Sequence, residues 1–130
     1  MNDVFTLSRV FTDEMEVALH SVYDGDTFFI DIPDIPEVFG ERISVRINRI
    51  DAPEMDDERP EVQEIAVKAK ERLEEVLQSG TIILKNVRRG KYFRLLAEVK
   101  VKDEDVGQLL LEEDLVREYK GRGIKPWTVL

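Results

Sequence analysis

The order of the expected elements predicts an α+β domain that is mainly β, built as a five-stranded β-barrel with one long helix between its third and fourth strands. Three β-rich runs lie before residue 51, an amphipathic stretch follows residue 60, and two more β-branched runs come after it. A chain of 130 residues is one ordinary domain with enough apolar side chains for a core. A single domain over residues 1–130 is therefore expected.

The first three long strands are expected to form an antiparallel meander. A short strand is expected at residues 4–10, so residues 1–14 would add an extra strand or an arm. The apolar positions of residues 15–23 fit a strand with one bulge, and Asp24-Gly25 before the β-rich run at 28–32 is a hairpin signal. The third strand is expected at residues 42–50, with Arg46 and Ile50 on one face and Ile47 on the other.

A helix is expected from near Pro60 to about Gln78, because apolar residues recur there at three-and-four spacing and Ser79-Gly80 follows. Strands at 81–87 and 92–101 come next, joined by a basic turn, and a short helix is expected from Val106 to Glu113. The segment from 115 to 130 is expected to pack irregularly, with Trp127 as an anchor. Five strands with a helix between the third and fourth is the pattern of an OB-fold barrel. Such barrels commonly bind nucleic acids or saccharides, but the fold alone does not give the function.

The charge is unevenly distributed. The net charge is −9, which repels a polyanionic partner on average. Five basic residues nevertheless gather without an acid between them: Lys85, Arg88, Arg89, Lys91 and Arg94. A local basic face on an acidic body therefore remains open.

Composition sets the remaining expectations. The chain is 42% hydrophobic and 36% charged, as in soluble globular proteins, and has no cysteine and no stretch of about 20 apolar residues to span a membrane. The first residues lack the basic segment and apolar run of a secretion signal. A cytoplasmic protein is expected, monomeric by default, although a secreted protein trimmed of its signal would look the same.

Several charged side chains form a constellation suited to phosphate chemistry. The meander can bring Asp26 and Asp51 together, and two facing carboxylates suit a hard divalent cation. Arg46 and Arg94 come from separate strands and can grip a phosphate, while Glu54 is free to accept a proton from water. These parts fit phosphodiester hydrolysis. The same residues also fit a simple hairpin turn beside a surface salt-bridge cluster.

In this order, the motifs resemble those of the staphylococcal nuclease (thermonuclease) family. That family has a DGDT hairpin, then an Arg followed by [IV]-D-[TA]-P-E, then a helix and K-Y-G-R. The corresponding segments here, between about Val17 and Trp127, are Asp24-Gly25-Asp26-Thr27, Arg46, Ile50-Asp51-Ala52-Pro53-Glu54 and Lys91-Tyr92-Phe93-Arg94. The resemblance implies an OB-fold barrel and a Ca²⁺-dependent nuclease that hydrolyses DNA, RNA or both.

The resemblance also implies a role for each matching residue. Ca²⁺ would be held by the carboxylates of Asp26 and Asp51 and by the backbone carbonyl of Ala52, with waters completing its shell. Glu54 would be the general base or would orient the attacking water. Arg46 and Arg94 would bind the scissile phosphate and stabilise charge as the 5′ oxygen leaves. Lys91 and Tyr92 match positions that contact a terminal phosphate of a bound nucleotide.

Three departures from the family pattern stand out. Phe93 and Asp114 replace glycines, and the loop Met55-Asp56-Asp57-Glu58 after the presumed base is acidic, which is expected to weaken affinity for long polynucleotides. The main alternative is a non-catalytic OB-fold module that binds nucleic acid or a protein partner. The negative net charge keeps that alternative open, and the retention of all five charged site residues speaks against it. The choice between DNA and RNA and between endo and exo attack stays open.

Overall fold

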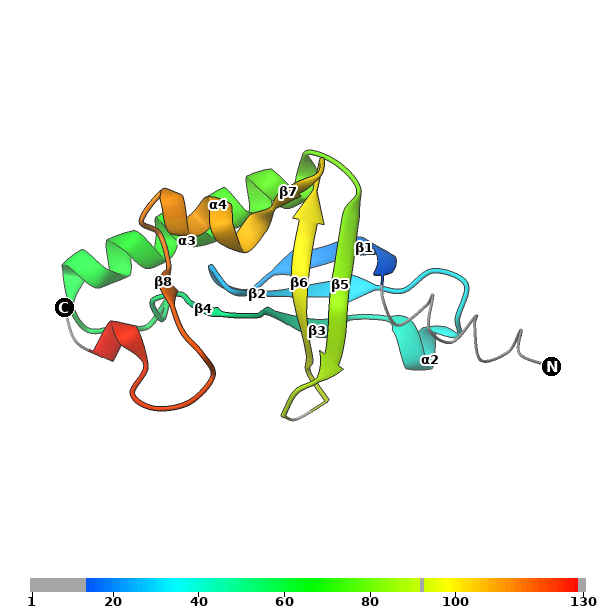
Figure 1. Cartoon of the computed structure of the whole chain (residues 1–130), viewed down its shortest axis with the longest axis horizontal. Helices are drawn as coiled ribbons and strands as arrows, with labels where there is room; N and C mark the ends of the chain where they lie inside the picture. The colour runs from blue at the N-terminus through cyan, green and yellow to red at the C-terminus, as the bar shows by residue number, and fades with distance from the viewer. Residues whose placement is uncertain (1–13, 92, 129–130) are drawn as a thin grey trace.

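The barrel is built from five strands that close on themselves (Figure 1). The computed structural model describes residues 14–91 and 93–128. The barrel strands are β1 (Glu14–Val22), β2 (Thr27–Asp31), β3 (Ile43–Ile47), β5 (Ile82–Arg89) and β6 (Leu95–Val101). They pair in the order β3-β2-β1-β5-β6, and a parallel pairing of β3 with β6 closes the ring. The predicted fold class, a mainly β OB-fold barrel, is confirmed.

The first hairpin agrees closely with the sequence expectation. β1 pairs antiparallel with β2, and its register shifts between Leu19 and Ser21, which is the expected bulge. Alternate residues of the strands point inward, so Phe28 and Ile30 of β2 are fully buried. The strand expected at residues 4–10 and most of the expected arm lie outside the described residues, and Glu14 already belongs to β1.

The third strand is shorter than predicted. β3 ends at Ile47, because Arg49 takes a left-handed backbone conformation (φ 71°) and turns the chain into the separate strand β4 (Ile50–Asp51). Ile47 and Ile50 are both 1% exposed, so the turn brings both into the core. The prediction that Ile50 shares a face with Arg46 is therefore wrong. A short helix, α2 (Glu37–Gly40), also occupies part of the expected loop before β3.

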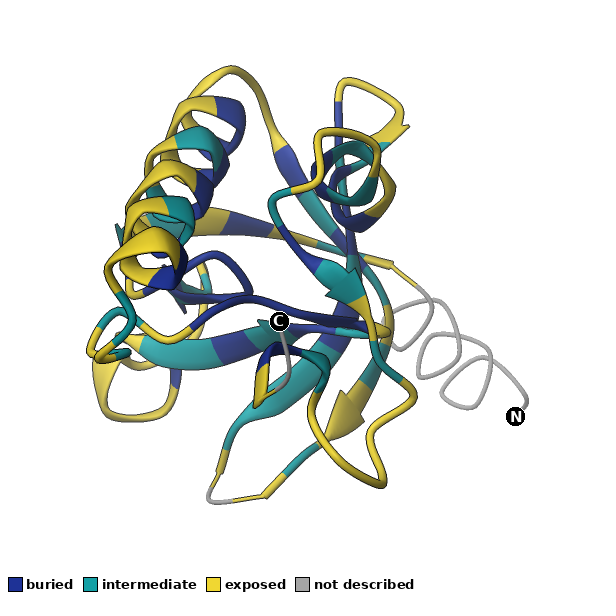
Figure 2. Cartoon of the chain, turned by 90° about the vertical axis from the view of Figure 1, so that its left-hand side faces the viewer, coloured by how far each residue is buried: buried dark blue, intermediate teal, exposed yellow. Residues whose placement is uncertain are grey.

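Two helices lie against the barrel. α3 (Pro60–Gln78) has the predicted bounds, and Figure 2 shows its inward face buried and its outward face exposed. α4 (Val106–Glu112) ends one residue before the prediction and follows the two-residue strand β7 (Glu104–Asp105). In α4, Val106 and Leu110 are buried as expected, and Leu109 is half-buried. Among the described residues, no helix has the length and apolar character needed to cross a membrane.

The C-terminal segment is more ordered than its sequence indicates. β8 (Arg117–Glu118) pairs antiparallel with β4, so that Asp51 lies opposite Arg117. The chain then ends its described part in the short helix η1 (Pro126–Thr128), drawn in red in Figure 1. The side chain of Trp127 is buried, as an anchor would be. The segment therefore returns to the strand that carries Asp51.

Candidate active site

The hairpin tip before β2 has a shape that its sequence requires. The backbone N–H of Asp26 donates to Oδ1 of Asp24 (3.0 Å), which closes the turn. A Cβ on Gly25 would lie 2.7 Å from Cβ of Ala69 and 2.9 Å from Cβ of Ala52, so a larger residue would push α3 or the chain after β4 away. The glycine lets the tip pack closely and fixes where Asp26 lies.

Asp26 joins the hairpin to the end of β4. Its Oδ1 accepts a hydrogen bond from Thr27 Oγ1 (2.7 Å), and its Oδ2 accepts one from the backbone N–H of Ala52 (2.8 Å). Asp26 is 5% exposed and Asp51 3% exposed. The structure thus brings together the two carboxylates that the sequence places 25 positions apart.

Arg46 lies between these two carboxylates. Its Nη2 is 3.4 Å from Oδ2 of Asp26 and 3.3 Å from Oδ1 of Asp51, and its side chain is 13% exposed. Both distances exceed those of a strong charge-assisted hydrogen bond, so neither contact holds the guanidinium tightly. The guanidinium carbon also lies 5.9 Å from the centre of the Tyr119 ring. Arg46 can therefore contact either carboxylate or a ligand beside them.

The carboxylates of this cluster repel one another, so each makes the charged form of its neighbours less favourable. Burial raises the pKa of Asp51, the Asp26 carboxylate raises it further, and Arg46 opposes the rise. Burial also raises the pKa of Asp24 to about 8, with the nearby Asp26 carboxylate as the next cause. Burial and the neighbouring carboxylate thus both disfavour the charged form of Asp24. The remaining carboxylate charge is only partly balanced by one guanidinium, and a cation at this point would relieve it.

The donor atoms are of the kind that a hard divalent cation prefers. Asp26 and Asp51 each offer carboxylate oxygens, and each oxygen has two lone pairs, so their present hydrogen bonds leave acceptor capacity. No group of three His, Cys, Asp or Glu side chains that could hold a metal occurs in residues 14–91 and 93–128. The expected ligand set has only two carboxylates, with a backbone carbonyl and waters, so the residues present fit it. The part of the Ala52 carbonyl stays a prediction.

Glu54 is the exposed acid beside this buried pair. Pro53 follows Ala52 and stiffens the chain, so Glu54 is presented at the surface. Glu54 lines a small cavity of about 100 Å³ together with Asp51, Lys125 and Trp127. Its charge also contributes to the raised pKa of Asp51. A solvent-accessible carboxylate thus lies next to two buried ones.

Arg94 is not in contact with the cluster. The parallel pairing of β3 with β6 places Arg46 opposite Leu96, and Arg94 lies two residues earlier, just before β6 begins at Leu95. Its half-buried side chain makes no hydrogen bond or ion pair with the described residues. Lys91 is exposed in the turn between β5 and β6, and Tyr92 lies outside the described residues. The roles expected for these three residues stay predictions.

The sequence does not predict a group of contacts that hold the backbone of Asp51 in place. The indole Nε1–H of Trp127 donates to the backbone carbonyl of Asp51 (2.7 Å). Arg117 stacks on the Trp127 ring, with its guanidinium carbon 3.9 Å from the ring centre, and Arg59 donates to the Trp127 carbonyl. From the sequence, Trp127, the only tryptophan of the chain, is expected to serve in packing alone. Its hydrogen bond goes to a backbone atom, and no residue type marks such an acceptor.

Comparisons with known proteins identify the family of this chain. The family model described as staphylococcal nuclease homologue matches residues 44–125, which include Arg46, the Asp51-Ala52-Pro53-Glu54 segment and α3. Endonuclease YncB of Bacillus subtilis (strain 168) is 36% identical over 107 residues, which cover 79% of this chain and 47% of that protein. The chain thus spans about half the length of this relative. It belongs to the staphylococcal nuclease homologue family.

Proposed function

We propose that this protein is a Ca²⁺-dependent nuclease that hydrolyses phosphodiester bonds of DNA, RNA or both. The observation that carries the proposal is the cluster of Asp26, Asp51 and Arg46 beside the exposed Glu54, in a chain of a nuclease family. A bound Ca²⁺ would lie at Asp26, Asp51 and the Ala52 carbonyl, where it would supply positive charge for the phosphate oxygens and orient water.

The residues divide the reaction between them. Glu54 takes a proton from a water molecule as the water oxygen attacks phosphorus. The bond from phosphorus to the 5′ oxygen breaks, and that oxygen takes up a proton from solvent. Arg46 and Arg94 balance the negative charge that develops on the phosphoryl oxygens. Lys91 and Tyr92 would contact a terminal phosphate of the bound strand.

The proposal is tested by cleavage assays on single-stranded DNA and RNA with Ca²⁺ or with excess chelator. We expect cleavage only with Ca²⁺, and a loss of about 10²–10⁴-fold for Glu54→Gln, the range for a general base. Arg46→Ala and Arg94→Ala should lose activity to a similar degree. Glu71→Gln and Lys68→Ala, on the exposed side of α3, make the same charge changes away from the site and should retain full activity.

Each variant is checked for folding by urea unfolding. Full cleavage in excess chelator, or an active and folded Arg46→Ala protein, would contradict the mechanism. A protein that binds either nucleic acid but cleaves neither would instead be the non-catalytic OB-fold module.

A further inference from the structure

A second cavity lies beside the candidate active site. It has a volume of about 360 Å³ and is lined by Asn48, Arg49, Arg88, Glu118, Tyr119 and Lys120. The Tyr119 ring in this lining is the ring that the guanidinium of Arg46 faces at 5.9 Å. The Tyr119 side chain therefore links Arg46 to this cavity.

The charge of this cavity is opposite to that of the whole chain. Arg49, Arg88 and Lys120 are exposed and make no ion pair with the described residues, and Glu118 is the acid in the lining. The chain as a whole carries a net charge of −9. Three unpaired cations around one hollow attract an anion locally, because screening confines such attraction to about 10 Å at ordinary salt concentrations.

The strand register connects the cavity to Arg46. Arg46 of β3 lies opposite Leu96 of β6, and Leu96 lies opposite Arg88 of β5. Residues that are paired across neighbouring strands point to the same face, so Arg46 and Arg88 share the outer face of the barrel. With about 4.8 Å between strands, their backbones lie about 10 Å apart. At that separation, two long arginine side chains on one face can contact neighbouring phosphates of one strand.

Arg49 is presented to the cavity by a strained turn. Its φ of 71° is rare for a long side chain, and its carbonyl accepts a hydrogen bond from the backbone N–H of Tyr119 (2.8 Å). The turn is thereby tied to β8, and the arginine stays at the cavity wall although its conformation costs energy.

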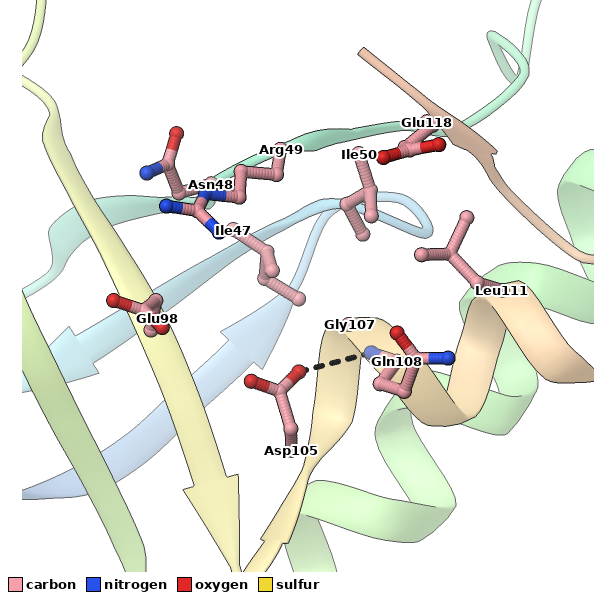
Figure 3. A pocket seen from close by; sticks show the side chains of 10 residues that line it. All are labelled: Ile47, Asn48, Arg49, Ile50, Glu98, Asp105, Gly107, Gln108, Leu111 and Glu118. Atoms are coloured by element: carbon pink, nitrogen blue, oxygen red, sulfur yellow. Dashed lines mark hydrogen bonds between the residues drawn. The ribbon is translucent and has the colours of Figure 1, made fainter. Parts of the chain in front are cut away.

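A neighbouring cavity of about 330 Å³ limits this basic region. It shares Asn48, Arg49 and Glu118 with the basic cavity, but Figure 3 shows the acids Glu98 and Asp105 on its other sides. Asp105 already accepts a hydrogen bond from the backbone N–H of Gln108 (2.9 Å) and caps α4. A phosphate is repelled there, so the basic cavity is the one suited to a polyanion.

We propose that Arg49, Arg88 and Lys120 bind a backbone phosphate of single-stranded nucleic acid next to the phosphate held at Arg46. The proposal rests on the proposed function of the Arg46 site and names its substrate as a polynucleotide strand rather than an isolated diester. Such contacts add affinity without reading sequence, because every nucleotide carries the same phosphate.

The test measures binding and cleavage separately. Fluorescence anisotropy in excess chelator gives the affinity for a labelled single-stranded DNA of about 12 nucleotides, which is within the length that one OB fold covers. We expect Arg49→Ala and Arg88→Ala each to weaken binding about 3–10-fold and to lower the slope of log affinity against log salt by about 0.7 for each lost contact. Glu118→Gln should tighten binding, and Lys68→Ala should leave it unchanged.

Cleavage assays then distinguish this proposal from the proposed function. With Ca²⁺, Arg49→Ala and Arg88→Ala should lower kcat/KM for the oligonucleotide and leave hydrolysis of bis(p-nitrophenyl) phosphate at the parent rate. An unchanged oligonucleotide affinity in both variants, or an equal loss on the small diester, would overturn the inference. If the parent cleaves neither substrate, the proposed function fails, and the anisotropy series still decides whether the cavity binds the strand.

Discussion

Asp51 is held at three points, two of them by groups from the C-terminal part of the chain. Its carboxylate faces Arg46, its backbone pairs with Arg117 of β8, and its carbonyl accepts the hydrogen bond of Trp127. A group that must lie within a fraction of an ångström of its working position needs such outer support. Under the proposed function, Trp127 would therefore position Asp51 in addition to packing in the core.

Replacing Trp127 with Phe tests this positioning role directly. The change removes the indole N–H and keeps an aromatic ring for Arg117 to stack on. We expect the free energy of unfolding to fall by about 1–2 kcal/mol, because the buried carbonyl of Asp51 loses its partner. We also expect the Ca²⁺ concentration for half-maximal cleavage to rise several-fold, measured by titration of Ca²⁺ in the oligonucleotide assay.

Val106→Ala provides the control for Trp127→Phe. Val106, the first residue of α4, is 1% exposed in the core, so its truncation destabilises the fold without changing a group that contacts Asp51. This variant should keep the parent's Ca²⁺ requirement. An equal rise in that requirement for both variants would mean that Trp127 acts through stability alone.

At the residue scale, the sequence predicts side chains better than it predicts backbone partners. The expected meander and the motifs that contain Asp26 and Asp51 predict that these two residues lie close together. In the structure, one nitrogen of Arg46 contacts both carboxylates. The contact of Trp127 with Asp51 joins residues 76 positions apart through a backbone oxygen. Every residue has that oxygen, so no pattern of residue types points to this contact.

At the scale of elements, the strength of the local stop signals decides how well a boundary is predicted. α3 begins at Pro60 and ends before Ser79-Gly80, and both signals are local and strong. β3 ends at Ile47 before Asn48-Arg49, where neither glycine nor proline is present. The pairing of β4 with β8 and the hydrogen bond from Tyr119 to Arg49 hold that turn, and both are tertiary contacts.

The two glycine positions of the family pattern are left-handed in this chain. Phe93 has a φ of 60° and Asp114 a φ of 59°. After α4, the backbone N–H of Asp114 donates to the Leu111 carbonyl and that of Leu115 to the Leu110 carbonyl (3.1 Å each). These two bonds form a Schellman motif, in which glycine is the preferred residue at the position of Asp114.

Asp114→Gly should therefore stabilise the protein. Relief of the left-handed strain outweighs the extra backbone entropy of glycine in the unfolded chain, and we expect a gain of about 0.5–1 kcal/mol in the free energy of unfolding. Asp114→Ala removes the same charge but keeps a Cβ, so it should show no gain. Urea unfolding of the three proteins measures the difference, and equal gains for Gly and Ala would show that charge is the cause.

At the scale of the whole molecule, the acidic loop after Glu54 is less repulsive than its composition indicates. Asp57 forms two hydrogen bonds with the Arg59 side chain (2.9 and 2.7 Å), and these bonds lower the pKa of Asp57 to about 2. Arg59 thus offsets that charge close to the site. Asp56 and Glu58 are exposed on the same loop and have no ion pair with the described residues.

The double variant Asp56→Asn/Glu58→Gln should bind single-stranded nucleic acid more tightly than the parent. It removes two negative charges near the exposed Glu54 and keeps the pair of Asp57 with Arg59 intact. We expect KM for an oligonucleotide to fall about 2–5-fold at low salt and the difference to shrink above about 0.3 M salt, because screening weakens repulsion between exposed charges. The kcat on bis(p-nitrophenyl) phosphate should not change. Glu71→Gln/Glu74→Gln on α3 makes the same change in net charge farther from Glu54. An equal fall in KM for both double variants would assign the effect to net charge and not to the loop.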